Sequence, residues 1–376
     1  MSRVRVGVIG VGHLGRHHAR VLDGIEGVEL VGVADSRIEQ ARAVAGPLGT
    51  DAVADYRELL DRVDAVSVAV PTVHHRAVAG AFLERGIAAM VEKPLAPNPA
   101  EARELVDLAR DRGAVLQVGH IERFNPALAI LDGLRLRPKF IAAERLGMYT
   151  FRSTDIGVVL DLMIHDLDLI LSRIPVPVVE VAAVGVSLFG AHEDVANARI
   201  RFEDGCVADL TASRASAQAV RKMRLWGAEG YASLDFAARS ARLVRPSDRL
   251  RRGDLELDGL DLAQPAAVKE HLFGKVFRVD QVQAEGREPL ALELEDFIQA
   301  VRTGSSPRVT GEDGLRALHL ADQILRSLNA HRWDGHPDGP TGPRDVPEPR
   351  PEPIAGLAGP ISWRLRNPNR IAPSET

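Results

Sequence analysis

Hydrophobic and polar positions follow two alternating patterns over the first 120 residues. Short apolar runs bounded by turn residues predict strands, and apolar residues recurring every three to four positions predict helices. Strands that alternate with helices favour a parallel sheet with helices on both faces. We therefore predict an α/β, doubly wound Rossmann domain over residues 1–122. The predicted strands are 4–10, 28–35, 65–70, 87–93 and 114–120, and the predicted helices are 18–25, 37–49, 76–86 and 99–113.

The pattern changes after about residue 125, where longer strand-like runs are separated by turn signals. These runs predict a second, α+β domain over 123–333 with a mainly antiparallel, open sheet. Gly205 after Glu203 and Asp204 predicts a hairpin, because glycine readily takes a positive φ. Residues 334–376 hold ten of the chain's 23 prolines and are predicted to be irregular. The predicted strand regions are 139–149, 178–190, 195–214, 221–236 and 240–246, and the predicted helices are 157–173, 291–303 and 312–330.

Composition narrows the functional classes. A chain of 376 residues suits two domains, and its net charge of −5 with 4% aromatic residues argues against nucleic-acid binding. We see no apolar run of eighteen residues and no signal peptide, so we expect a cytoplasmic protein without a membrane span. The single cysteine, Cys206, excludes an internal disulfide and a cysteine-based zinc cluster, so no structural metal is expected.

A glycine-rich turn follows the first predicted strand and precedes a helix. Gly10, Gly12 and Gly15 have the G-x-G-x-x-G spacing that lets a backbone approach a pyrophosphate at a helix N-terminus. Asp35, twenty residues beyond Gly15, ends the second strand, where a carboxylate binds the adenosine ribose hydroxyls and favours NAD. Arg37 would offset the repulsion of a 2′-phosphate, which leaves NADP open. The predicted cofactor contacts in this region are Gly10, Gly12, His13, Leu14, Gly15, Asp35, Ser36 and Arg37.

Two further motifs carry ionisable groups. Glu92, Lys93 and Pro94 stand at the end of a predicted strand, and ligands of a doubly wound sheet bind at that edge. Pro94 fixes a turn there, in the trans or the cis form, and so directs Lys93. On its own, a Glu-Lys pair is more often a surface ion pair.

In the helix predicted over 157–173, Asp161 and His165 lie four positions apart, with Asp168 three positions further along the same face. Histidine is the usual acid or base near neutral pH, and a carboxylate one turn away orients it. Two other interpretations of this spacing stay open. One is a metal site formed by the three residues, and the other is helix capping or solvated charge.

These three motifs, in this order, resemble the Gfo/Idh/MocA family of NAD(P)-dependent sugar oxidoreductases over residues 4–330. The resemblance implies that the lysine of E-K-P and the Asp and His of the helix form the catalytic group, here Lys93, Asp161 and His165. It also places His75, four residues after Pro71, near the nicotinamide. Further candidate cofactor contacts are therefore Pro71, His75, Glu92 and Lys93. The charge of Glu92 allows two roles, which the sequence leaves open: it positions Lys93, or it lies near the nicotinamide ribose. Val158, Val159 and Met163 stand where many members have glycine, which implies a different pocket shape.

Residues 118–127 and 196–214 resemble the branch of this family that oxidises the 3-hydroxyl of UDP-N-acetylglucosamine. This implies a nucleotide-sugar substrate, with Arg123, Asn125 and Arg214 as candidate substrate contacts. The alternatives are a dehydrogenase of a free sugar or inositol and a non-catalytic NAD-bound regulator of the same fold. Members of the family usually pair through the open sheet, so we expect a homodimer or homotetramer.

Overall fold

The computed structural model describes residues 3–132, 136–150, 156–189, 192–253, 261, 263–331 and 342. Except for Gly342, the tail predicted over 334–376 lies outside the described residues. The predicted fold class is confirmed: a six-stranded parallel sheet is joined to an eight-stranded, mostly antiparallel sheet. No helix in the described part of the chain is long and apolar enough to cross a membrane.

The first sheet has the strand order β3-β2-β1-β4-β5-β6, and every paired strand is parallel. The order reverses between β1 and β4, and ligands of such sheets bind beyond the carboxyl ends of the strands at that point. The three-residue β3, which begins at the exposed Asp51, is too short for its hydrophobic pattern to predict it. The strands are β1 (Val4–Ile9), β2 (Val28–Ala34), β3 (Asp51–Val53), β4 (Ala65–Val68), β5 (Ala88–Glu92) and β6 (Leu116–Gly119).

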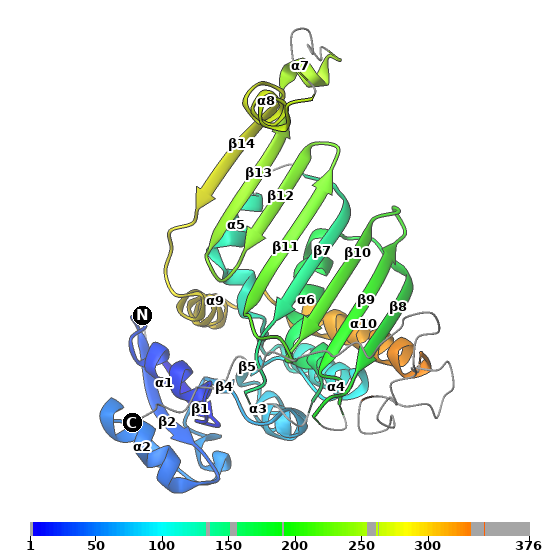
Figure 1. The fold of residues 1–376 in the computed structure, drawn as a ribbon. Coiled ribbons are helices and arrows are strands. Elements are labelled where there is room, and N and C mark those ends of the chain that lie inside the picture. Colours follow the sequence, from blue (N-terminus) through cyan, green and yellow to red (C-terminus); the bar gives the residue numbers. More distant parts are fainter. Residues whose placement is uncertain are drawn as a thin grey trace, which may run out of the picture.

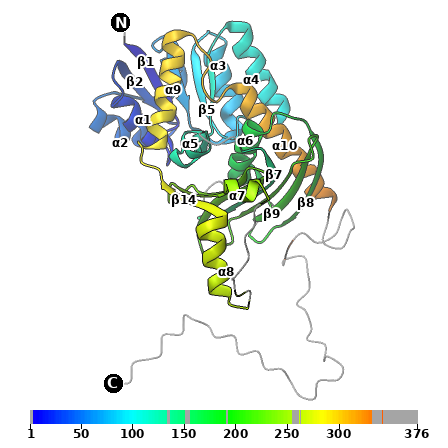
Figure 2. The ribbon, with the colours of Figure 1, turned by 90° about the horizontal axis from the view of Figure 1, so that it is seen from above.

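Helices cover both faces of this sheet. One of them, α9, comes from the C-terminal part of the chain (Figure 2). Leu294 and Phe297 of α9 are fully buried in the same apolar core as Val6 and Val8 of β1. Residues almost 300 positions apart thus form one core. The helical elements of this region are α1 (Gly15–Asp23), α2 (Ile38–Leu48), α3 (His75–Leu83), α4 (Pro99–Arg112), α9 (Pro289–Thr303), and the 3-10 turns η1 (Tyr56–Leu59), η2 (Thr72–His74) and η3 (Ile121–Phe124).

The second sheet has the order β14-β13-β12-β11-β7-β10-β9-β8. Only β7 and β10 pair in parallel, and the hairpin predicted at Gly205 is confirmed, with φ +78° between β9 and β10. The strands are β7 (Pro138–Leu146), β8 (Val178–Val186), β9 (Val195–Phe202), β10 (Val207–Ser213), β11 (Val220–Gly227), β12 (Gly230–Asp235), β13 (Ser240–Pro246) and β14 (Phe277–Gln283).

One face of the second sheet packs on helices α5, α6 and α10, which lie behind the strands in Figure 1. The strand β9 shows the consequence, because Ala198, Ile200 and Phe202 are buried whereas the intervening Arg199 and Arg201 are exposed. The other face of this sheet is therefore open in the single chain. The helical elements here are α5 (Pro126–Asp132), the π-helical η4 (Val159–Met163), α6 (Ile164–Arg173), α7 (Asp248–Arg251), α8 (Pro265–His271), the π-helical η5 (Leu272–Val276) and α10 (Gly311–Ala330).

Candidate active site

The glycine-rich turn has the geometry of a phosphate cradle. Gly10 has φ +83°, and a Cβ on Gly15 would lie 1.8 Å from the carbonyl oxygen of Gly10, so neither position admits a side chain. Beside Gly12 the space is open, because a Cβ there would meet no atom closer than 3.8 Å. Helix α1 begins after Leu14 without a side-chain cap and without an acidic residue in its first turn. The turn thus suits the pyrophosphate of a dinucleotide.

Asp35 stands at the carboxyl end of β2, next to this turn. Its Oδ2 accepts a hydrogen bond from the backbone N–H of Val11 at 3.1 Å, and Oδ1 accepts one from that of Arg37 at 3.0 Å. These bonds hold the carboxylate beside the cradle, as binding of the adenosine ribose requires. The Arg37 guanidinium lies 3.8 Å from Asp35 and is largely exposed, as are His13, Leu14 and Ser36.

The Glu92-Lys93-Pro94 turn follows β5 and contains a cis peptide bond between Lys93 and Pro94. His75 is buried beneath it, with Nδ1 2.9 Å from the carbonyl oxygen of Pro94 and Nε2 3.0 Å from that of Val70. Burial lowers the pKa of His75, so the ring is neutral and donates to only one of the two carbonyls. His75 links the ends of β4 and β5, while Pro71 beside it is exposed.

Glu92 belongs to a buried polar chain under the same turn. Its Oε1 lies 3.1 Å from Nε2 of His18, whose Nδ1 lies 2.8 Å from the Ser67 hydroxyl. Because a carboxylate only accepts, His18 donates to Glu92 through Nε2. Burial raises the pKa of Glu92, but the His18 hydrogen bond and the Lys93 charge outweigh it and hold this pKa below its usual value. Glu92 is therefore an anion at neutral pH, fixed behind Lys93.

Lys93, which follows β5 of the first sheet, contacts Asp161, which lies between β7 and β8 of the second sheet in the chain. The Lys93 ammonium donates to the Asp161 carboxylate at 2.9 Å and to the Asp161 backbone oxygen at 2.7 Å. Asp161 lies in η4, a π-helical turn that replaces part of the helix predicted over 157–173. Single π-helical turns within helices occur frequently at functional sites. Glu193 accepts from the N–H of Val159 at the start of this turn, and a Cβ on Gly157 would lie about 2 Å from the Glu193 carboxylate.

His165 lies in α6, one turn after Asp161, and is partly exposed. Burial lowers its pKa well below 6.5, and the positive charges of Lys93, Arg145 and Arg221 lower it further. The ring is therefore neutral at pH 7 and able to accept a proton. Its Nδ1 is buried without a hydrogen-bond partner. The predicted orientation of His165 by Asp161 has no counterpart in the described contacts, since Asp161 is bound to Lys93.

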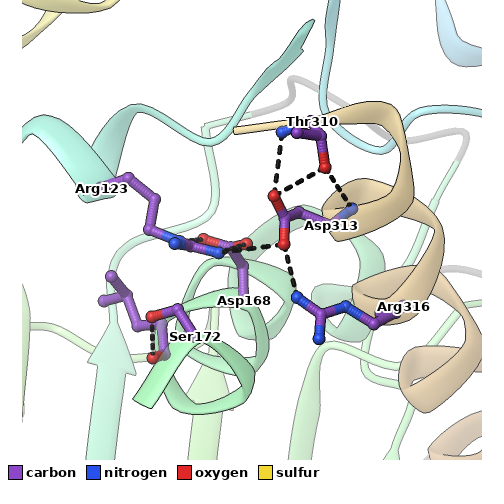
Figure 3. Close-up of polar contacts among 7 residues, drawn as sticks. Arg123, Asp168, Ser172, Thr310, Asp313 and Arg316 are labelled. Carbon is purple, nitrogen blue, oxygen red and sulfur yellow. Dashed lines mark hydrogen bonds and ion pairs between the residues drawn. The ribbon is translucent and has the colours of Figure 1, made fainter. Parts of the chain in front are cut away.

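No described hydrogen bond joins Asp168 to Asp161 or His165, and the shared helix face predicted for these three residues remains a prediction. Asp161 lies in the π-helical η4, whereas His165 and Asp168 lie in α6, where Asp168 forms a two-point ion pair with Arg123 at 2.6 and 3.0 Å (Figure 3). Asp313, in the capping turn of α10, lies 3.7 Å from the same guanidinium. Arg123 thus ties α6 to α10. Among the described residues, no three ligand side chains are grouped to hold a metal.

The other two predicted substrate contacts also lie in internal networks. Asn125 is buried and donates to Glu122 at 2.9 Å and to the Phe236 carbonyl at 3.1 Å. Arg214 is buried, donates to Asp194 at 2.5 Å and lies over the Tyr149 ring. The Asn125 contact joins the start of α5 to the end of β12, and the Arg214 contact joins the end of β10 to the start of β9. The binding roles predicted for Arg123, Asn125 and Arg214 remain predictions.

Two residues that sequence reasoning missed stand near His165. His120 follows β6, at the same sheet edge as Lys93, and its ring lies edge to face with that of His165, with centroids 6.1 Å apart. Arg221 lies two and four positions before the buried Met223 and Leu225 of β11, so it is on the same, helix-covered face of the sheet. Arg221 is exposed and pairs with no other described residue. The sequence signal for Arg221 was a charged residue at a position where the strand alternation predicts a side chain facing the core.

Comparisons with known proteins agree with this geometry. Residues 4–120 match the oxidoreductase family with the NAD-binding Rossmann fold, and residues 138–233 match the GFO/IDH/MocA C-terminal domain. The chain is 37% identical, over 331 residues, to UDP-N-acetylglucosamine 3-dehydrogenase of Acidithiobacillus ferrooxidans, covering 88% of this chain and 99% of the relative. It belongs to the Gfo/Idh/MocA oxidoreductase family.

Solved structures match the fold of this chain over most of its length. That of the Acidithiobacillus enzyme matches with a TM-score of 0.77 at 36% identity and covers 88% of this chain and 99% of its own. Levoglucosan dehydrogenase, at 20% identity and a TM-score of 0.73, covers 87% of this chain and 97% of its own and shows the shared fold. Inositol 2-dehydrogenase of Rhizobium meliloti is 27% identical over 353 residues, which are 88% of this chain and 98% of the relative.

Family membership makes this chain an NAD-binding oxidoreductase. The phosphate cradle and Asp35 have the donors and the open space that NAD requires. When bound, NAD supplies the acceptor for a hydride. The Lys93, Asp161 and His165 group lies beyond the carboxyl ends of β5 and β6, where the Gfo/Idh/MocA chain brings the second sheet against the Rossmann edge.

Proposed function

We propose that this Gfo/Idh/MocA oxidoreductase oxidises the 3-hydroxyl of UDP-N-acetylglucosamine with NAD. The observation that carries the proposal is the 37% identity to a UDP-N-acetylglucosamine 3-dehydrogenase over 99% of that enzyme's length. The inositol 2-dehydrogenase, 27% identical over a similar length, is the reference for the alternative of a free cyclic polyol.

The described contacts suggest how the residues divide the work. His165 is the general base: its neutral ring takes the proton of the substrate hydroxyl. Lys93 is the cation that holds the hydroxyl oxygen and eases its deprotonation, and Asp161 positions Lys93 through their 2.9 Å ion pair. In the alternative, Lys93 is the general base and His165 holds the hydroxyl oxygen. The pH dependence of kcat in variants of Lys93 and of His165 distinguishes the two assignments. A chain that retains all three residues fits an enzyme better than a non-catalytic regulator.

Arg221 supports a substrate that bears phosphate. It is an exposed cation whose charge reaches His165, yet no described residue pairs with it. An unpaired guanidinium beside a sugar-oxidising site is suited to bind a diphosphate, because it presents a fork of donors to phosphate oxygens. Inositol and free glucose carry no negative charge for it to bind.

The substrate test follows the absorbance of reduced cofactor with UDP-N-acetylglucosamine, other UDP-sugars, myo-inositol and glucose, each with NAD and NADP. We expect turnover with UDP-N-acetylglucosamine and NAD. Activity restricted to myo-inositol or glucose would contradict the proposal. The NADP series also tests whether Arg37 permits the second cofactor.

The variant Arg221→Ala tests the phosphate contact separately. Loss of a charge-assisted bond of about 1.5–3 kcal/mol raises KM for the UDP-sugar about 10- to 100-fold. The matched control is Arg110→Ala, which removes one exposed arginine of α4 that pairs with Asp107. An unchanged KM in Arg221→Ala would remove the phosphate role.

We also propose a homodimer or homotetramer that pairs through the open face of the second sheet. Phe140, Trp226 and Tyr231 form an aromatic cluster on that face, with ring centroids 5.0 Å apart for Phe140–Trp226 and for Trp226–Tyr231. Their positions alternate with the buried residues of β7, β11 and β12, so they face away from the helices. Large aromatic residues are enriched in interfaces.

A further inference from the structure

His120 is a buried histidine whose ring has no hydrogen-bond partner among the described residues. Only 1% of its surface is exposed, and neither ring nitrogen has a hydrogen bond. A neutral imidazole has one donor and one acceptor, and burying both without partners costs free energy. Such a group in a folded chain calls for a water, a ligand or a function.

The neighbour of this ring is His165, whose Nδ1 is likewise buried and unpartnered. The ring centroids are 6.1 Å apart at an interplanar angle of 85°, and no hydrogen bond joins the rings. Nδ1 of His165 and the two nitrogens of His120 are thus three unsatisfied polar atoms in one buried region. A buried water needs two to four polar partners, and these atoms supply them.

A functional histidine needs a group that fixes its tautomer. The hydrogen bond that one ring nitrogen makes determines which of the two nitrogens carries the proton. Asp161 is committed to Lys93 and Asp168 to Arg123. The ring of His120 lies edge to face with that of His165, and among the described residues the nitrogens of His120 are, like Nδ1 of His165, buried without a hydrogen-bond partner.

The surrounding charges differ between the two rings. His165 faces the cations Lys93, Arg145 and Arg221, and the charged neighbours that dominate its pKa all lower it. His120 faces Asp168 and Glu92, which raise its pKa, and Arg123 and Lys93, which lower it. Although burial lowers both pKa values, a positive charge is better balanced on His120 than on His165.

We propose that His120 positions His165 through one bridging water and receives the proton that His165 removes from the substrate hydroxyl. This inference rests on the proposed function for the origin of that proton. Nε2 of His165 gains the hydroxyl proton, and Nδ1 releases its own proton to the water. The water passes one of its protons to His120, so His165 is neutral again and His120 is the imidazolium. No further oxidant or reductant is needed, because only protons move among these groups.

The first test needs no substrate. In protein labelled with ¹⁵N-histidine, the resonances of His165 are assigned by their loss in His165→Gln. We expect the wild-type chain to have His165 protonated at Nδ1 and unprotonated at Nε2, and His120→Phe to lose this single tautomer. Protonation of wild-type His165 at Nε2 would overturn the proposal even if His120→Phe failed to fold.

The second test is kinetic and uses the substrate established by the screen. We expect His120→Phe to lower kcat about 10- to 100-fold, by analogy with the loss caused by removing the residue that orients a metal-bound histidine. NAD affinity stays unchanged, and His120→Asn, which keeps an acceptor, recovers part of kcat. Wild-type kcat and pH profile in His120→Phe would overturn the inference. If UDP-N-acetylglucosamine is not a substrate, the proposed function fails while the tautomer test still decides the role of His120.

Discussion

Glu293 carries a buried carboxyl group that has no hydrogen-bond partner among the described residues. It lies in α9 with none of its surface exposed, and both carboxyl oxygens lack hydrogen bonds. Burial raises the pKa of Glu293 well above 4.5, and the nearby carboxylates of Glu92 and Asp168 raise it further. The folded chain therefore keeps this carboxyl protonated at pH values where the unfolded chain releases the proton.

The sign and size of the effect follow from this difference. Because the folded state binds more protons, stability falls as the pH rises above 4.5. Each pH unit between 4.5 and the raised pKa of the folded state costs about 1.4 kcal/mol of stability, so the cost at pH 7 is at most about 3.5 kcal/mol. Glu293→Gln has almost the same shape but does not titrate. We expect this variant to exceed the wild type in free energy of unfolding by up to that amount at pH 7, and by less than about 1 kcal/mol at pH 5.

The assay is urea unfolding of both proteins at pH 5 and pH 7, followed by circular dichroism. Glu295→Gln is the matched control, since Glu295 lies on the same helix but pairs with Arg287 near the surface. We expect no pH-dependent gain from it. A Glu293→Gln variant that is less stable than the wild type at pH 7 would refute the reasoning, because the carboxylate would then be ionised and paired.

Two further predictions concern the catalytic group and the assembly. Lys93→Ala removes the cation next to Asp161 and should lower kcat about 10²- to 10⁴-fold while NAD binding, measured by fluorescence titration, is retained. Wild-type turnover would exclude Lys93 from the reaction. Trp226→Glu places a charge in the aromatic cluster of the open sheet face and should shift the mass measured by light scattering at micromolar concentration from a multiple to that of one chain. A monomeric wild type would contradict the proposed assembly.

Local patterns accounted for most of the fold. Strands β1, β2, β4, β5 and β6 and helices α9 and α10 lie where their hydrophobic periods place them, because each element buries one continuous apolar face. The hydrophobic pattern did not predict elements that have few or no buried residues. Strand β14 consists of the polar-rich residues 277–283, and helices α7 and α8 have no buried residue.

The candidate site divides in the same way. The sequence alone determined the glycine turn, Asp35 and the E-K-P turn, because backbone geometry and strand ends demand particular residues at short, fixed separations. Only the tertiary structure decided the partners of Asp161, Asp168 and Arg123. The spacing of Asp161, His165 and Asp168 along the chain permits several ion pairs. Lys93 and Arg123 come from other elements, so only the packing of those elements determines that Lys93 pairs with Asp161 and Arg123 with Asp168. Likewise, only the fold could bring His120 to His165, because the contact joins elements 45 residues apart and leaves no period in the chain.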